Sequence, residues 1–186
     1  MEYLQGESLF DRLVRVKTLS VPQTLSIVMQ TCDGLAEAHQ RGMIHRDIKP
    51  SNLFLAEIGG ESDIVKIVDF GLATTQSTTA KGAASRICGT PRYMSPEQIR
   101  GDDLDGRSDL YAIGCVAIEC LTGSAPFTAS SMSVLLSEHL FKMPRLESVD
   151  QIDEQLAKVL RKCLEKDRDE RITTVTEQKS ALNALQ

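Results

Sequence analysis

Residues 45–52 read HRDIKPSN, a polar segment with apolar, patterned sequence on both sides of it. Before it, apolar side chains recur at three- and four-residue steps over residues 24–41, which predicts an amphipathic helix. After it come NLFLA (52–56) and DIVKIV (63–68), two short strand candidates on either side of a Gly-Gly pair. The sequence therefore predicts a polar loop between a long helix and a β-hairpin.

The rest of the chain reads as mostly helical. Residues 108–121 are apolar on nearly every side, which predicts a buried central helix, and residues 152–164 and 175–185 also have helical patterns. The segment 74–85 (TTQSTTAKGAAS) is small, polar and aperiodic, and it predicts a flexible loop. No internal repeat is visible. The expected fold class is mainly α with a small β-hairpin.

Composition excludes several classes of protein. The 186 residues (20.5 kDa) are 41% hydrophobic and 25% charged, as in one soluble domain, and the net charge of -5 disfavours nucleic acid and anionic lipid as partners. No apolar run approaches the ~18 residues of a membrane helix, and the first residues lack the basic start of a secretory signal. The five cysteines form no CxxC pair, which disfavours a disulfide framework or a zinc site and fits a cytoplasmic protein.

Three motifs occur in a fixed order: HRDIKPSN (45–52), DFG (69–71) and GTPRYMSPE (89–97). Together they resemble the eukaryotic-type protein kinases, and in detail the bacterial serine/threonine kinases. MEYLQGESLFDRL (1–13) resembles the hinge between the two lobes of a kinase and the helix that follows it. The resemblance covers nearly the whole chain and implies the fold of the large, C-terminal lobe.

The resemblance assigns chemistry to specific residues. It implies that Asp47 orients the hydroxyl of the substrate, that Lys49 brings a cation to the transferred phosphate, and that Thr90 contacts both Asp47 and the substrate. Asn52 and Asp69 would supply oxygen ligands to Mg²⁺, which prefers such donors. The residues expected to contact the cofactors ATP and Mg²⁺ are Glu2, Leu4, Lys49, Asn52, Phe54 and Asp69.

Other residues have structural roles by the same resemblance. His45 and Phe70 would pack beneath the site, and Asp109 and an Arg171–Glu97 pair would tie the lobe together. We interpret His39 and His139 as packing or surface residues. Thr90 could instead be only a turn residue before Pro91, and Phe54 could be an ordinary core phenylalanine.

The segment before GTPRYMSPE corresponds to the activation loop of the family. Arg46 would lie near a phosphorylated side chain there, since guanidinium binds phosphate in two-pronged fashion. The position that often holds the phosphothreonine is Arg86 in this chain, so Ser85, Thr78 and Thr79 are the candidate acceptors. An unmodified polar loop is the alternative.

The sequence also lacks parts of a whole kinase domain. The Gly-rich motif GxGxxG, which covers the phosphates of ATP, occurs nowhere, and no VAIK-type lysine precedes the hinge-like segment. We therefore expect residues 1–186 to be a partial kinase domain of hinge and C-terminal lobe. By itself it would bind Mg²⁺–ATP weakly, turn over little and leave apolar side chains partly uncovered.

These observations predict a serine/threonine protein kinase lobe. In the intact parent it would transfer the γ-phosphoryl group of ATP to Ser or Thr hydroxyls of a protein substrate. A separate kinase N-lobe or a regulator would be a further partner, and neither nucleic acid nor a membrane segment is expected. A non-catalytic pseudokinase, or a decoy that binds substrates through residues 89–97, stays open as the alternative.

Overall fold

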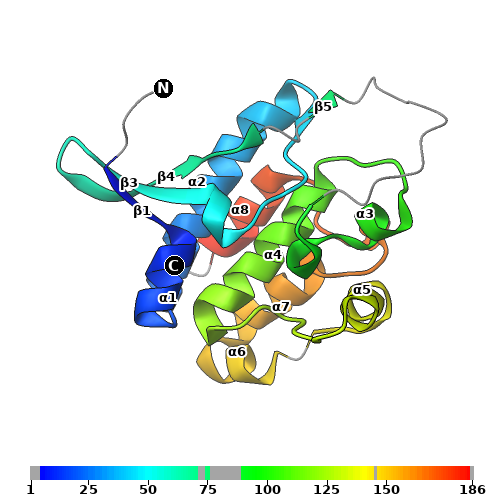
Figure 1. The fold of residues 1–186 in the computed structure, drawn as a ribbon. Coiled ribbons are helices and arrows are strands. Elements are labelled where there is room, and N and C mark those ends of the chain that lie inside the picture. Colours follow the sequence, from blue (N-terminus) through cyan, green and yellow to red (C-terminus); the bar gives the residue numbers. More distant parts are fainter. Residues whose placement is uncertain (1–4, 71–73, 76–88, 145, 185–186) are drawn as a thin grey trace.

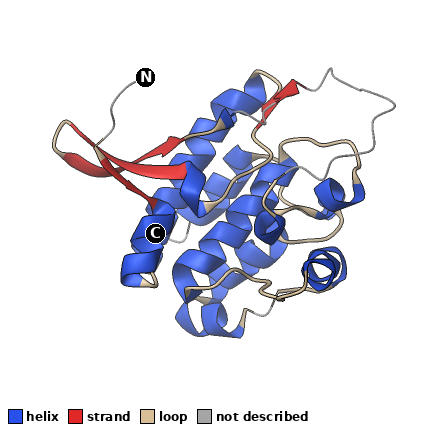
Figure 2. Ribbon diagram, viewed as in Figure 1, coloured by secondary structure: helices blue, strands red, loops and turns tan. Residues whose placement is uncertain are grey.

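The computed structural model describes residues 5–70, 74–75, 89–144 and 146–184. The described chain is mainly helical, with its largest sheet at one side of the helical body (Figures 1 and 2). The α-helices are α1 (Leu9–Val16), α2 (Val21–Gln40), α3 (Pro96–Arg100), α4 (Arg107–Thr122), α5 (Met132–Phe141), α6 (Glu147–Ile152), α7 (Glu154–Cys163) and α8 (Val175–Asn183). The strands are β1 (Gly6–Ser8), β2 (Met43–Ile44), β3 (Leu53–Ile58), β4 (Glu61–Ile67) and β5 (Thr74–Thr75). Three short 3₁₀ helices complete the description: η1 (Pro50–Asn52), η3 (Pro91–Tyr93) and η4 (Arg168–Glu170).

The predicted hairpin is confirmed and forms part of a larger sheet. Strands β3 and β4 pair antiparallel around Gly59 and Gly60, whose φ angles of 61° and 87° suit glycine in a tight turn. Strand β1 pairs antiparallel with β3 on its other edge. At Gly6 (φ 140°) a Cβ atom would lie 2.1 Å from the carbonyl oxygen of Leu55, so only glycine fits there.

One part of the predicted flexible loop is a strand instead. Thr74 and Thr75 form β5, which pairs antiparallel with β2 in the register Met43 to Thr75 and Ile44 to Thr74. Pairing of the backbone explains this strand, because the sequence around the two residues has no alternating apolar pattern that would predict one. The remaining positions of the segment 74–85 lie outside the described residues.

Helix α4 lies at the centre of the helical body, as predicted for residues 108–121 (Figure 1). Nearly every side chain between Ser108 and Ile118 is buried, and α2, α6, α7, α8 and η3 all contact the helix. Gly114 lets α7 approach closely, since a Cβ atom there would lie 3.0 Å from Cβ of Cys163. Helix α4 is therefore the scaffold from which polar side chains at its ends can be held rigidly.

Further helix predictions are confirmed with two corrections. α2 and α8 occupy the predicted ranges to within a few residues. The predicted helix 152–164 is α7, which begins two residues later than expected, because Asp153 accepts a hydrogen bond from the backbone N of Leu156 (2.9 Å) and caps the helix there. Helix α5 was not predicted, since its sequence MSVLLSEHLF is apolar on several sides and has no helical stripe.

Four of the five cysteines lie in described residues, and each of them is buried and free. Burial raises the pKa of Cys32, Cys120 and Cys163 to about 12, so these thiols stay protonated and act as small apolar groups. Cys88 lies outside the described residues. None of the helices in the described part of the chain has the length and apolar character needed to cross a membrane.

Candidate active site

The loop 45–52 is anchored by one buried carboxylate, that of Asp109 on α4. Asp109, 1% exposed, accepts hydrogen bonds from the backbone N of His45 (3.0 Å) and the backbone N of Arg46 (2.9 Å). Its Oδ2 also lies 2.8 Å from Nε2 of His39 on α2. A buried carboxylate is costly unless its oxygens are satisfied, and this arrangement satisfies both while fixing the loop backbone. The predicted structural role of Asp109 is confirmed.

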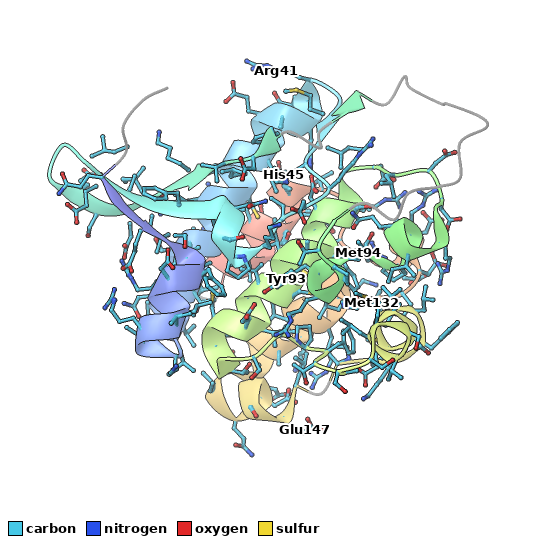
Figure 3. All side chains as sticks on the ribbon, in the orientation of Figure 1. Arg41, His45, Tyr93, Met94, Met132 and Glu147 are labelled. Atoms are coloured by element: carbon cyan, nitrogen blue, oxygen red, sulfur yellow. The ribbon has the colours of Figure 1, made fainter. Side chains whose placement is uncertain are left out.

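His45 supports the loop from inside the molecule, close to α4 (Figure 3). Its ring packs edge-on against Phe70 at 4.6 Å between centroids, and its Nε2 lies 3.0 Å from the carbonyl oxygen of Val68. The backbone N–H of Asp47 donates to Nδ1 (3.3 Å), so Nε2 carries the proton and donates to Val68. His45 thereby links the loop 45–52 to the chain around Asp69, and the predicted support role of His45 and Phe70 agrees with these contacts.

Gly89 and Gln98, at the two ends of the segment 89–98, both lie against the backbone of the same loop. Gln98 Nε2 donates to the carbonyl oxygen of Arg46 (2.7 Å), and Arg46 adopts a left-handed φ of 70°. Gly89 passes so close that a Cβ atom would lie 3.0 Å from that same carbonyl oxygen. The close approach brings Thr90 to Asp47.

The side chains of Thr90, Lys49 and Asn52 all form hydrogen bonds to Asp47. Its Oδ1 accepts hydrogen bonds from the backbone N and from Oγ1 of Thr90, both at 2.8 Å. Its Oδ2 accepts one from Nζ of Lys49 (2.6 Å), and Lys49 also donates to Oγ1 of Thr90 (2.9 Å). Asn52 Nδ2 donates to the backbone carbonyl of Asp47 (2.9 Å). The predicted catalytic residues Asp47, Lys49 and Thr90 thus lie within hydrogen-bond distance of one another, and we call them, with Asn52, the Asp47 cluster.

The Asp47 cluster is partly open to solvent, unlike a core network. The side chains of Asp47 and Lys49 are 11% and 24% exposed. Asp47 can therefore accept a proton or a hydrogen bond from an incoming hydroxyl, and Lys49 can turn its charge toward an anion, without any rearrangement of the backbone. This is the arrangement that a proton acceptor beside a cation needs.

Asp69 is linked to this cluster through its neighbour Val68, which is bonded to Asn52. It is exposed, its φ is 61°, and no described residue forms a hydrogen bond or ion pair with its side chain. Its neighbour Val68 donates a backbone hydrogen bond to the carbonyl oxygen of Asn52 (2.9 Å), which ties the two predicted metal ligands to one backbone junction. Non-glycine residues in the left-handed region often mark functional positions.

Asn52 and Asp69 fit a Mg²⁺ ion by the chemistry of their donors. Asn52 uses its amide nitrogen toward Asp47, which leaves Oδ1 with only a long contact of 3.5 Å to Oγ of Ser51. Within the described ranges no group of three or more His, Cys, Asp or Glu could hold a metal ion by itself. Mg²⁺ commonly takes one or two protein oxygens and completes its shell with phosphate oxygens and water, so two oxygen donors would be enough in number for it.

A second polar network lies at the opposite end of the segment 89–97. Arg171 donates to both carboxylate oxygens of Glu97, at 2.7 and 2.8 Å, and Ser108 Oγ donates to Oε1 (2.8 Å). The side chains of Arg171 and Glu97 are 0% and 3% exposed. Burial alone would raise the pKa of Glu97, but the hydrogen bonds and charge of Arg171 outweigh it and hold that pKa below its usual value. The predicted Arg171–Glu97 pair is confirmed.

Comparison with known proteins agrees with this geometry. The sequence profile described as the protein kinase domain matches residues 1–183. The chain belongs to the protein kinase family. Both polar networks lie on motifs that carried the resemblance to this family, one on HRDIKPSN (45–52) and the other on GTPRYMSPE (89–97).

Three similar kinases come from bacteria. The chain is 42% identical over 148 residues to serine/threonine-protein kinase pkn3 of Myxococcus xanthus, an alignment that covers 77% of this chain and 27% of that protein. It is 37% identical to Pkn1 of Myxococcus xanthus (98% of this chain, 26% of that protein) and 35% identical to PknB of Mycobacterium leprae (98% and 29%). The chain thus spans under a third of the length of these relatives and is similar to one segment of bacterial serine/threonine kinases.

The predicted nucleotide contacts are placed only in part. Glu2 and Leu4 lie outside the described residues, as do Gly71 and the predicted phosphate acceptors Thr78, Thr79 and Ser85. Phe54 is half-buried on β3, opposite Ser8 of β1, and does not belong to the hydrophobic core. Its position thus argues against the alternative that Phe54 is an ordinary core phenylalanine.

Sequence reasoning missed three polar contacts of the kinase lobe. His39 lies against Asp109 and is more than a packing residue, Gln98 holds the carbonyl of Arg46, and Glu119 Oε2 accepts a hydrogen bond from the hydroxyl of Tyr93 (2.7 Å). Tyr93 lies beside α4 (Figure 3). Only Gln98 carried a signal, because Ser95-x-x-Gln98 is a capping-box pattern that predicts the start of α3. Contacts across long sequence separations leave no local pattern.

Proposed function

We propose that this chain supplies the catalytic lobe of a protein kinase that transfers the γ-phosphoryl group of ATP to Ser or Thr hydroxyls of a protein. The observation that supports this most strongly is the Asp47 cluster, in which a carboxylate, an ammonium and a hydroxyl lie within 2.6–2.9 Å of one another beside Asn52. Phosphoryl transfer needs little covalent help from the protein, and positioning and charge supply most of the catalysis.

Asp47 is the proposed acceptor for the substrate hydroxyl. Thr90 donates two hydrogen bonds to its Oδ1 and fixes the plane of the carboxylate, while Oδ2 faces Lys49. An incoming hydroxyl would donate to this carboxylate and pass its proton there as the new P–O bond forms. The bond from the γ-phosphorus to the bridging oxygen would break in the same transfer, and ADP would leave with the electron pair. Lys49 would then neutralise charge that spreads over the phosphoryl oxygens.

Asn52 and Asp69 would hold Mg²⁺ through Oδ1 and the carboxylate, respectively. When bound, the ion would neutralise charge on the phosphate oxygens of ATP. The protein's own contribution is to fix both donors at one backbone junction, through the Val68–Asn52 hydrogen bond of 2.9 Å and the bond between His45 and Val68. Dependence on cytosolic ATP places the proposed activity in the cytoplasm.

The proposed acceptor class rests on two supports. The relatives named above are serine/threonine-protein kinases, and Lys49 with GTPRYM (89–94) resembles that subgroup and not the tyrosine kinases.

A small kinase lobe is also part of the proposal, because tight ATP binding needs the Gly-rich motif GxGxxG, which is absent from the 186 residues. By themselves, the 186 residues would bind Mg²⁺–ATP weakly.

A comparison of two proteins tests this function. One is the chain as it stands, and the other is the chain joined at its start to a bacterial kinase small lobe with a Gly-rich loop and a VAIK lysine. We expect transfer of labelled phosphate to a Ser/Thr peptide only from the joined protein, and loss of that transfer on Asp47→Asn. A joined protein that binds Mg²⁺–ATP and peptide but transfers nothing would refute the enzyme and favour a binding module. Equally robust transfer by the chain alone would refute the need for the second lobe.

A further inference from the structure

His139 is a buried polar side chain to which the proposed mechanism gives no role. It lies on α5 with an exposed fraction of 0%, and its ring packs edge-on against Phe127 at 4.7 Å between centroids. Helix α5 contacts η3, the short helix that directly follows Thr90. His139 thus belongs to the helix that packs against the segment presenting Thr90 to Asp47.

The hydrogen bonds of the His139 ring fix the position of its proton. Lys166 donates through Nζ to the hydroxyl of Tyr111 (3.3 Å), and that hydroxyl lies 2.9 Å from Nδ1 of His139. Because an ammonium group can only donate, the Tyr111 hydroxyl accepts from Lys166 and donates its own proton to Nδ1. Burial lowers the pKa of His139 to about 4, so the ring is neutral near pH 7 and its single proton is on Nε2.

The Nε2–H group of His139 is buried without a hydrogen-bond partner among the described residues. Such donors are rare in folded proteins, since burial removes their hydrogen bonds to water. The backbone of Arg92 in η3 acts on the same ring and raises its pKa, as a carbonyl acceptor does by favouring the protonated form. The N–H group therefore faces the Arg92 carbonyl without the geometry of a full hydrogen bond.

The backbone between Arg92 and the proposed proton acceptor is short and fixed at both ends. The backbone N–H of Tyr93 donates to the carbonyl of Thr90 (2.9 Å), which closes η3 around Pro91 and Arg92. The backbone N–H of Thr90 in turn donates to Oδ1 of Asp47 (2.8 Å). A shift of the Arg92 carbonyl would therefore move Thr90 relative to Asp47, and a small misplacement of such groups slows a transfer reaction.

We propose that His139 is a positioning residue for phosphoryl transfer, because its Nε2–H group holds the carbonyl of Arg92 and keeps η3 where Thr90 meets Asp47. The attraction between an N–H and a carbonyl group extends beyond hydrogen-bond geometry, and it opposes any movement of η3 away from α5. His139 itself touches none of the reacting groups. Since Thr90 contacts the substrate only under the function proposed above, the catalytic consequence of this contact rests on that function.

Hydrogen exchange of the native chain tests the positioning role without any enzymatic activity. The variant His139→Leu removes the N–H group, and we expect the amide of Tyr93 to exchange about fivefold faster, as for the loss of one neutral hydrogen bond. His139→Met also lacks a donor and should behave in the same way. The amides of His45 and Arg46, which are bonded to Asp109, are the internal reference and should keep their rates.

Two further variants separate the N–H group from the packing of the ring. His139→Gln can accept from Tyr111 through its amide oxygen and donate to Arg92 through its amide nitrogen, so it should restore the native exchange rate of Tyr93. Phe127→Leu is the matched control, because it removes an apolar contact of the His139 ring and leaves the N–H group in place. Its Tyr93 amide should exchange within about twofold of the native rate.

Kinetics of the chain joined to a small kinase lobe test the catalytic consequence. His139→Leu should lower kcat/KM for the Ser/Thr peptide about fivefold and leave KM for ATP within about twofold, whereas His139→Gln and Phe127→Leu should match the native protein. If the native joined protein transfers no phosphate, the proposed function fails, and the exchange rates still decide whether His139 holds η3.

Three results would overturn the positioning role of His139. The first is a Tyr93 amide that exchanges equally fast in His139→Leu and Phe127→Leu. The second is a Tyr93 amide that stays fast in His139→Gln. The third is a loss of peptide kcat/KM in Phe127→Leu as large as that in His139→Leu, because packing of the ring would then explain the effect.

Discussion

The Asp47 cluster and the Glu97–Arg171 pair are built from the same kinds of group and are used in opposite ways. Each sets a carboxylate against a cation and a hydroxyl at 2.6–2.8 Å. Around Glu97 the side chains are at most 3% exposed, whereas Asp47 and Lys49 remain 11% and 24% exposed. Ser108 and backbone carbonyls complete the hydrogen bonds of the buried pair, whereas no hydrogen bond or ion pair joins the Asp69 side chain to another described residue.

The difference separates a group that stabilises the fold from one that is available for chemistry. A buried pair with every hydrogen bond satisfied cannot exchange partners without a large cost in free energy. A partly exposed cluster with spare oxygens can bind a metal ion, a phosphate or a hydroxyl in place of water. Substitutions in the two networks should therefore change different measured quantities, catalytic rate in one and stability in the other.

The largest expected effect is on the rate at Asp47. In the chain joined to a small lobe, Asp47→Asn should lower kcat about a thousandfold, since the amide keeps the shape but cannot accept the proton. The free energy of unfolding should stay nearly constant. Labelled-phosphate transfer and urea titration measure the two quantities. The matched control is Asp33→Asn, because Asp33 is an exposed partner of Lys179 (2.6 Å) and its loss should leave kcat unchanged. Equal losses of kcat in the two variants would contradict a catalytic role for Asp47.

The next effect is on stability at Arg171. Arg171→Met leaves Glu97 buried without its cation, and it should lower the free energy of unfolding by about 3–5 kcal/mol. The double variant Glu97→Leu/Arg171→Met should recover most of this loss, because it removes both charges. Urea unfolding of the chain measures both. A single variant with wild-type stability would mean that the pair does not brace the fold.

A third effect is the pH dependence of stability, which His139 should dominate near neutrality. Burial first, and then the charge of Lys166, lower the pKa of His139 from 6.5 to about 4. Between pH 6.5 and pH 4 the unfolded chain thus binds a proton at His139 that the folded chain does not bind. The contribution of neutral His139 to the free energy of unfolding is therefore complete above pH 6.5. It is lost as the pH falls toward 4, by about 3 kcal/mol in all. Glu97 has a lowered pKa and adds its own loss only below about pH 4.5.

The variant His139→Gln isolates the contribution of His139. It can keep a hydrogen bond to Tyr111, whose hydroxyl lies 2.9 Å from Nδ1 of the native ring, but it cannot titrate. Its free energy of unfolding should be flatter than that of the native chain between pH 6.5 and 5. Parallel curves for the two proteins in that window would contradict the assignment.

The smallest expected effect sharpens the role of Thr90. Thr90→Val removes the hydroxyl that bridges Asp47 and Lys49 but keeps the backbone hydrogen bond, and it should lower kcat about tenfold, in line with the loss of one hydrogen bond to a charged group. Thr90→Ser should retain most of the rate. A kcat for the Val variant equal to that of the Ser variant would leave Thr90 as a turn residue only.

The sequence predicted the local features well because their causes are local. The apolar stripe of α2 and the Gly-Gly turn between β3 and β4 are written in consecutive residues. The Asp47 cluster was predicted through motif order and not through geometry, since Thr90 lies 43 residues from Asp47. Strand β5 and the contact of His39 with Asp109 escaped prediction, because both depend on partners far along the chain.

Mn²⁺–ATP added to the isotope-labelled chain tests the central claim most directly, because paramagnetic Mn²⁺ broadens the NMR signals of nearby amides even when binding is weak. The account predicts that the amide signals of Asn52, Val68 and Asp69 broaden at the lowest concentrations, and that those of Glu97 and Arg171 stay sharp. Broadening that begins at Glu97 and Arg171, or that spares residues 52 and 68–69 throughout the titration, would contradict it.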